Sequence, residues 1–92
     1  MSQHRSISET RRKILANNIR KFVTEDRSTK SDIAVYIGVS VRQLDRYMNG
    51  TSEPLATTLY LLAQATMVDV KRFFMTESEW KFLSGNSKGY VK

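Results

Sequence analysis

The side chains of this chain that could do chemistry are mostly basic, and they gather in its first half. The 92 residues hold 15 lysines and arginines against 9 acidic residues, for a net charge of +6. Residues 1–50 hold 10 of the basic and 5 of the acidic side chains, a net +5, so residues 51–92 keep only +1. A basic half indicates a polyanionic partner, either nucleic acid or an anionic membrane, although unpartnered solvated charges are common on small proteins.

Catalytic and metal-binding chemistry is not indicated. The chain has no cysteine and a single histidine, His4, in a polar N-terminal run. It shows no glycine-rich phosphate loop and no paired carboxylates. We therefore expect no enzyme activity, no catalytic residue, no cofactor and no metal. No apolar run is long enough to span a membrane and the N-terminus lacks a signal-peptide apolar region, so we expect a cytoplasmic protein without a membrane partner.

Residues 29–50 predict two short capped helices joined by a glycine turn. Thr29 begins a T-x-x-D pattern, and Ser40 with Gln43 completes an S-x-x-Q pattern, so each predicts a capping box at a helix start. Gly38 lies between the two helices, where glycine takes the left-handed backbone of a helix C′ position without a steric penalty. Two capped helices around one glycine turn suggest a helix-turn-helix.

Five or six short helices around one core are predicted, with no strand pattern. They cover about residues 9–25, 30–37, 41–49 and 55–66, then a short helix capped by Asp69 and a last turn or two from Thr76 that Gly85 ends. In the first of them, Leu15, Ile19 and Phe22 form an apolar stripe that must pack on the other helices. Leu55, Leu59, Leu62 and Ala63 form the inner stripe of the fourth helix.

Four cations occupy the other face of the first long helix, and their role stays open from the sequence alone. They are Arg11, Arg12, Arg20 and Lys21. Either they are solvated charges on an amphipathic helix, or some of them reach the phosphates of a nucleic acid.

The segment resembles the helix-turn-helix of the phage lambda repressor and Cro family. Its small, glycine, apolar and aliphatic positions are Ala34, Gly38, Val39 and Leu44 in the family's register. Later positions also match, at Asn49-Gly50, Pro54, Leu59, Leu62-Ala63, Val68 and Phe73. The resemblance covers about residues 12–75 and implies an all-α, compact five- or six-helix bundle of the lambda repressor-like DNA-binding type. The chain departs from the family at Lys30, Leu55, Thr66 and Met67, where many members have Gln, Ser, Leu and Gly.

Three regions follow from this resemblance. Residues 1–8 are expected to be a flexible arm, residues 9–75 the DNA-binding domain with its motif at 29–50, and residues 76–92 a helical turn and tail that could dimerise.

The resemblance also implies which side chains meet double-stranded DNA. The helix of residues 41–48 would lie in the major groove, and its base-contacting residues would be Val41, Arg42, Gln43, Asp45 and Arg46. Residues that match backbone-contacting positions are Lys30, Ser31, Asn49 and Thr51. Arg42 is the best candidate for a bidentate contact with guanine. Asp45 would be repelled by phosphate, so we expect it to pair with Arg42 or Arg46, although it could instead accept from cytosine.

The implied function is that of a sequence-specific transcriptional regulator, with a repressor favoured, that binds a palindromic operator as a homodimer. The large apolar residues of the C-terminal third would form the dimer surface: Val70, Phe74, Trp80, Phe82 and Leu83. Trp80 and Leu83 could instead fold back on their own core. The alternative function is that of an adaptor or antitoxin-like protein that uses the same fold to bind proteins. A contact with RNA polymerase is possible and is left open by the sequence.

Overall fold

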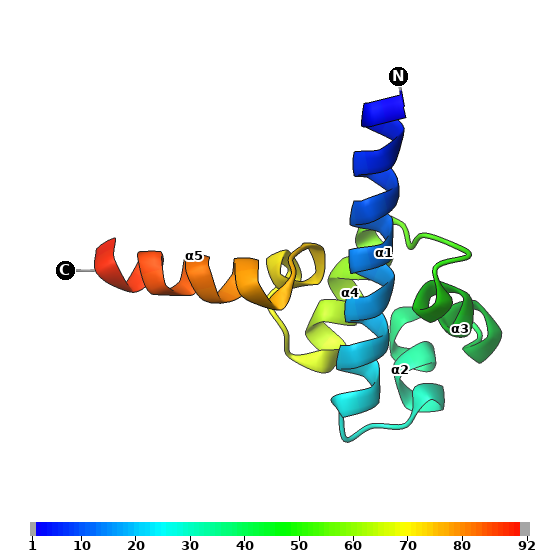
Figure 1. Cartoon of the computed structure of the whole chain (residues 1–92). Coiled ribbons are helices and arrows are strands. Elements are labelled where there is room, and N and C mark those ends of the chain that lie inside the picture. Colours follow the sequence, from blue (N-terminus) through cyan, green and yellow to red (C-terminus); the bar gives the residue numbers. More distant parts are fainter. Residues whose placement is uncertain (1, 91–92) are drawn as a thin grey trace.

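Five α-helices and one short 3-10 helix make up the chain in a computed structural model, which describes the backbone of residues 2–90 and the side chains of residues 8–84 (Figure 1). In order they are α1 (Ser2–Glu25), α2 (Lys30–Ile37), α3 (Val41–Asn49), α4 (Ala56–Thr66), η1 (Val70–Phe74) and α5 (Glu77–Tyr90). No strand occurs in the described range. The predicted all-α bundle is therefore confirmed.

Helix α1 contacts α2, α3 and η1, and its apolar stripe forms one side of the core. Ile19 and Phe22 are buried as predicted, and Leu15 is partly buried against the same cluster. The helix begins at Ser2, so the predicted start near Glu9 is wrong. The run before Glu9 contains neither proline nor glycine, and nothing in it therefore stops the helix.

The same core includes buried side chains of α2, α3, α4 and η1. Its largest fully buried side chains are Ile19, Ile33, Leu44, Leu62 and Phe73. Burying one such side chain contributes about 1.5–3 kcal/mol relative to leaving it in water. Phe73 meets Phe22 edge-on, with ring centroids 5.0 Å apart, so η1 is fixed against α1.

The two motif helices begin and end where the local signals predict. The Thr29 hydroxyl accepts from the backbone N–H of Asp32 at 3.1 Å, which caps α2. Gly38 ends this helix with φ 80°, and Gly50 ends α3 with φ 82°. Both glycines take the left-handed backbone that only glycine adopts without a penalty. The motif's backbone is thus determined by residues within it.

Helix α4 starts one residue later than predicted, and Leu55 is not part of its buried stripe. Leu59, Leu62 and Ala63 are buried, but Leu55 is 73% exposed. Leu55 is the N-cap residue and has an extended backbone, so its side chain does not follow the helical periodicity. At the other end of α4, Met67 takes a left-handed backbone with φ 57°, which costs a non-glycine residue about 1–2 kcal/mol.

Replacing Leu55 with serine is expected to stabilise the protein by about 1 kcal/mol. No side chain caps the start of α4, and a serine hydroxyl at the N-cap accepts from a free N–H of the first turn. The exposed leucine loses little when it is removed. Urea unfolding followed by circular dichroism measures the change, with Leu55→Ala as the control that should give no gain. Equal stabilities of the serine and alanine variants would contradict the capping argument.

Helices η1 and α5 are capped as predicted. The Asp69 carboxylate accepts from the N–H of Lys71, and Asn18 of α1 donates to the carbonyls of Phe73 and Met75, both at 2.8 Å. Thr76 and Glu79 form a complete capping box, since each side chain accepts from the other's backbone N–H, at 3.0 and 3.1 Å. These bonds fix where α5 leaves the body of the protein.

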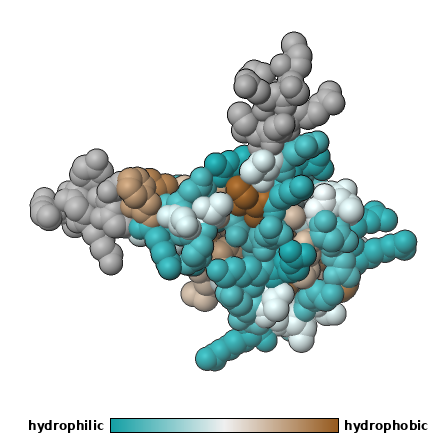
Figure 2. All heavy atoms as spheres, viewed as in Figure 1, coloured by the Kyte–Doolittle hydropathy of each residue, from teal (hydrophilic) through white to brown (hydrophobic). Residues whose placement is uncertain are grey.

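Helix α5 continues past Gly85 to Tyr90, so its predicted end at Gly85 is wrong. Glycine within a helix costs only about 1 kcal/mol and stops a helix only where the backbone turns left-handed. The helix projects away from the other elements (Figure 1). Apolar atoms gather over it, whereas hydrophilic atoms cover most of the face of α1 and α3 seen in Figure 2.

The contact between α1 and α5 should weaken in acid. Arg11 makes two hydrogen bonds of 3.0 Å to the Glu79 carboxylate, and these, with the N–H of Thr76, lower the pKa of Glu79 to about 2. Because the pKa of this carboxyl is lower in the folded state than in the unfolded state, its ionisation stabilises the folded state. This contribution is complete above the unfolded-state pKa of about 4.3 and is lost as the pH falls towards 2. Thermal unfolding between pH 5 and 2 should show this loss, and Glu79→Gln should lose less. Parallel pH profiles for the two proteins would contradict it.

Candidate nucleic-acid interface

The outward face of α3 carries the two arginines that the sequence singles out. Leu44 and Tyr47 are buried and Met48 packs partly on the core, so the opposite side of the helix must face solvent. Arg42 and Arg46 lie there, one helical turn apart and exposed. Among the residues whose side chains are described, neither has a hydrogen-bond or ion-pair partner. Two guanidinium groups without a partner among the described residues therefore extend from one face of α3.

Gln43 is held by its own chain. The Ser40 hydroxyl accepts from the N–H of Gln43 at 3.0 Å, as half of the predicted capping box. The other half does not form, because the Gln43 amide donates to the Ser52 hydroxyl at 3.0 Å. The reciprocal capping box is therefore wrong, and the Gln43 side chain connects α3 to the loop that follows it. Val41, also expected to face outward, is half-buried against the core.

Asp45 pairs with Lys30 and not with either arginine. The Lys30 ammonium lies 2.7 Å from the Asp45 carboxylate, and both side chains are 46% exposed. The expected pair with Arg42 or Arg46 is wrong, because the start of α2 meets the middle of α3 closely enough for Lys30 to reach the carboxylate. The pair leaves both arginines free and holds the ammonium group beside the exposed face of α3.

The other expected backbone-contacting residues lie at the two ends of the motif. Ser31 is exposed in the first turn of α2. Asn49 and Thr51 lie at the end of α3, where the side-chain amide oxygen (Oδ1) of Asn49 accepts from both the N–H and the hydroxyl of Thr51. The two N–H groups of the Asn49 amide remain without a partner in the described part of the chain. They extend the set of donors on the face that carries Arg46.

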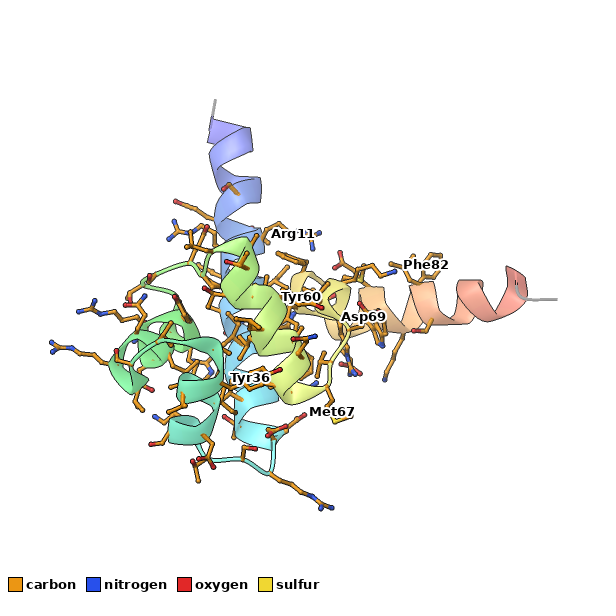
Figure 3. The ribbon with its side chains drawn as sticks, turned by 180° about the vertical axis from the view of Figure 1, so that it is seen from behind. Arg11, Tyr36, Tyr60, Met67, Asp69 and Phe82 are labelled. Atoms are coloured by element: carbon orange, nitrogen blue, oxygen red, sulfur yellow. The ribbon has the colours of Figure 1, made fainter. Side chains whose placement is uncertain are left out.

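The expected dimer residues divide into two groups. Val70 is half-buried against the core, and Trp80 is half-buried beside the Arg72 guanidinium, 5.6 Å from its ring centre. Phe74, Phe82 and Leu83 are 47%, 68% and 42% exposed. These three line an open hollow of about 490 Å³ together with Arg11, Met75 and Glu79. Figure 3 shows Phe82 on the projecting helix and Arg11 on α1.

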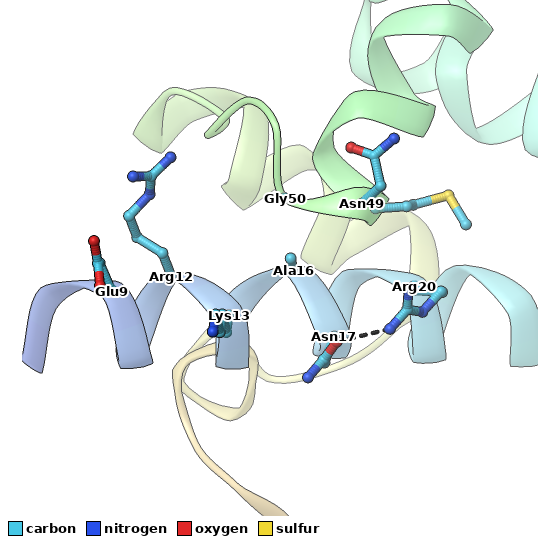
Figure 4. Close-up of a pocket in the computed structure, with 9 residues that line it drawn as sticks. Glu9, Arg12, Lys13, Ala16, Asn17, Arg20, Asn49 and Gly50 are labelled. Atoms are coloured by element: carbon cyan, nitrogen blue, oxygen red, sulfur yellow. Dashed lines mark hydrogen bonds between the residues drawn. The ribbon is translucent and has the colours of Figure 1, made fainter. Parts of the chain in front are cut away.

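A groove between α1 and the end of α3 contains cations that the sequence does not distinguish from the rest. It has a volume of about 490 Å³ (Figure 4), and its lining residues are Glu9, Arg12, Lys13, Ala16, Asn17, Arg20, Met48, Asn49 and Gly50. Of the four cations expected on α1, Arg12 and Arg20 face this groove. Arg11 and Lys21 turn the other way and pair with Glu79 and Glu77 of α5. Lys13 is not among the cations that the sequence predicts for this face. Its position relative to the apolar stripe of α1 is the one sequence signal that indicates which way it faces.

Comparison with known proteins identifies the class. A family model described as helix-turn-helix matches residues 19–72, more than half of the chain. The protein belongs to this helix-turn-helix family of the lambda repressor and Cro type, a class of DNA-binding regulators of transcription. The match covers α2, α3, α4 and most of η1, and it begins at Ile19 of α1.

One solved structure is similar over most of the chain. It is the solution structure of LexA, an SOS-response transcriptional repressor from Eubacterium rectale, with a TM-score of 0.67 and 19% identity over 74% of this chain and 72% of that one. At this identity the likeness shows the fold alone. A search of curated proteins gives no match. No helix in the described residues has the length and apolar character needed to cross a membrane.

Proposed function

We propose that the protein is a sequence-specific transcriptional repressor that binds a palindromic operator as a homodimer, with α3 in the major groove. The observation that carries this proposal is the pair of free arginines on the exposed face of α3. A guanidinium fork donates two parallel hydrogen bonds to O6 and N7 of guanine, a pattern that only guanine offers in the major groove. The caps at both ends of α3 and the buried Leu44 fix the helix backbone from which the two arginines extend.

The residues of α3 proposed to contact DNA bases differ in the contact that each can make. Arg42 lies in the first turn of α3, the end that enters the groove in helix-turn-helix complexes, and reads a guanine. Arg46 lies one turn later and reads a second base or holds a phosphate. Gln43 reaches a base only by leaving Ser52, and half-buried Val41 offers at most an apolar edge to a thymine methyl.

The residues proposed to contact DNA phosphates lie on either side of the exposed face of α3. The Lys30 ammonium has three donors, so it keeps one bond to Asp45 and turns the others to a phosphate. The N–H groups of the first turn of α2, around Ser31, and the free amide of Asn49 add donors at the two ends, with Thr51 beside Asn49. Asp45 then acts by positioning Lys30, and a cytosine contact would require that pair to break.

The second copy docks on the exposed apolar face of Phe74, Phe82 and Leu83. One helix-turn-helix domain contacts too little DNA for tight specific binding, and two copies on half-sites about 34 Å apart solve this. A projecting helix with exposed phenylalanine and leucine side chains favours contact with an equivalent helix.

Titration of labelled duplex DNA at several salt concentrations tests the binding itself. We expect retention of duplex DNA at low salt and a steep fall of the association constant as salt rises, because each neutralised phosphate adds about 0.9 to the slope of log K against log salt. Absence of any retained duplex at low salt would contradict the proposal and favour a protein-binding adaptor.

Sedimentation equilibrium tests the homodimer. We expect wild-type protein to form dimers and Phe82→Glu to be monomeric, because a charge at the centre of an apolar interface is costly. The control is Tyr60→Glu, since Tyr60 is 56% exposed on α4, away from this face. A monomeric wild type, or dimers in both variants, would contradict the assignment of the surface.

A further inference from the structure

The groove between α1 and α3 lies beside the face of α3 that carries Arg42 and Arg46, and its α1 side lies outside the helix-turn-helix motif. Its floor is the close approach of Ala16 to Gly50, where a Cβ built on the glycine would lie 3.4 Å from that of Ala16. Lys13, Asn17 and Arg20 stand on the α1 side, and Met48 and Asn49 on the α3 side (Figure 4). Asn49 follows Arg42 and Arg46 on the outward face of α3, so the groove begins where that face ends.

Some of the charged side chains that line the groove have no oppositely charged partner among the described residues. Arg12 is paired with Glu53 at 2.7 Å, and Glu9 lies at the far end of the groove from α3. Arg20 donates to the side-chain amide oxygen (Oδ1) of Asn17 at 2.7 Å, a neutral partner that orients the guanidinium without cancelling its charge. Lys13 has no partner among the described residues. Lys13 and Arg20, neither of which is paired with a carboxylate in the described part of the chain, therefore line a hollow that adjoins α3.

We propose that this groove binds a phosphate of the DNA backbone next to the segment read by α3, through Lys13 and Arg20 with the amide of Asn49. This inference rests on the proposed DNA binding and extends it beyond the motif, because all the α1 residues of the groove except Arg20 precede the matched segment. An oxyanion suits the site, since ammonium, guanidinium and amide groups are all donors. The contact adds affinity and carries no base information.

The double variant Lys13→Gln/Arg20→Gln tests the groove. We expect it to weaken binding on the order of tenfold, by the same factor for preferred and unrelated duplexes, and to lower the slope of log K against log salt by about 0.9. The control is Lys71→Gln/Lys81→Gln, which removes the same charge from exposed side chains of η1 and α5, on the other side of α1 from α3. It should leave the slope nearly unchanged.

Glu9→Gln tests the groove through a change expected to strengthen DNA binding, where the double variant weakens it. Removing the one carboxylate of the groove should tighten binding to all duplexes, which a structural role for the groove would not do. If wild-type protein binds DNA while the double variant keeps the wild-type slope, or loses no more than the control, the groove proposal is overturned and the function stands. If wild-type protein retains no duplex, both are overturned. Circular dichroism checks that each variant is folded.

Discussion

Replacing Arg42 with alanine is expected to remove most of the discrimination at one guanine of the operator. A bidentate pair between arginine and guanine contributes about 1–3 kcal/mol against a wrong base, which is roughly 5- to 150-fold in affinity. The side chain is exposed and unpartnered among the described residues, so its loss should not unfold the protein. The dissociation constants of the preferred duplex and of one changed at that guanine, measured at one salt concentration, give the ratio.

Arg42→Lys is the matched control for the Arg42→Ala change. Lysine keeps the charge but has no planar fork, so it should restore general affinity without restoring discrimination. Equal weakening of both duplexes by alanine, with full rescue by lysine, would contradict a reading role and assign Arg42 to a phosphate.

Replacing Phe73 with alanine is expected to cost about 3–5 kcal/mol of unfolding free energy. Phe73 is fully buried, meets Phe22 edge-on and closes the core between η1 and α1. A domain of this size is stable by about 5–15 kcal/mol, so the variant should lose a large share of its stability. Urea unfolding followed by circular dichroism measures the loss.

The neighbouring Phe74 provides the control for Phe73. It is 47% exposed in a single chain, so Phe74→Ala should cost less than about 1 kcal/mol when both variants are unfolded at a protein concentration low enough for them to be monomeric. Similar losses in the two variants would contradict the assignment of one phenylalanine to the core and the other to the surface.

Local signals explain why so much of the motif could be predicted. The glycines at 38 and 50 form the predicted turns, and the hydroxyls of Thr29 and Ser40 form the hydroxyl half of each predicted capping box. All four act within a few residues of their own position. The same holds for the capping box of Thr76 with Glu79. Leu55 does not follow the predicted apolar stripe because it is the N-cap residue of α4, whose backbone is extended and not helical.

Contacts between helices could not be predicted in this way. Lys30 reaches Asp45 because α2 and α3 cross at a particular distance, and no pattern in the sequence gives that distance. Likewise Arg11 and Lys21 face α5, whereas Lys13 faces α3. These last three are cations on one amphipathic helix, and only the positions of the elements around α1 divide them into structural pairs and candidate phosphate ligands.

Selection of bound sequences from a pool of random duplex DNA is the measurement that tests the central claim most directly. The proposed function predicts enrichment of one sequence with two inverted half-sites, centred about 10–10.5 base pairs or one helical turn apart, with a guanine at a fixed place in each. Enrichment should depend on Arg42. Recovery of duplexes with no common sequence, or of none at low salt, would contradict the assignment of α3 as a reading helix.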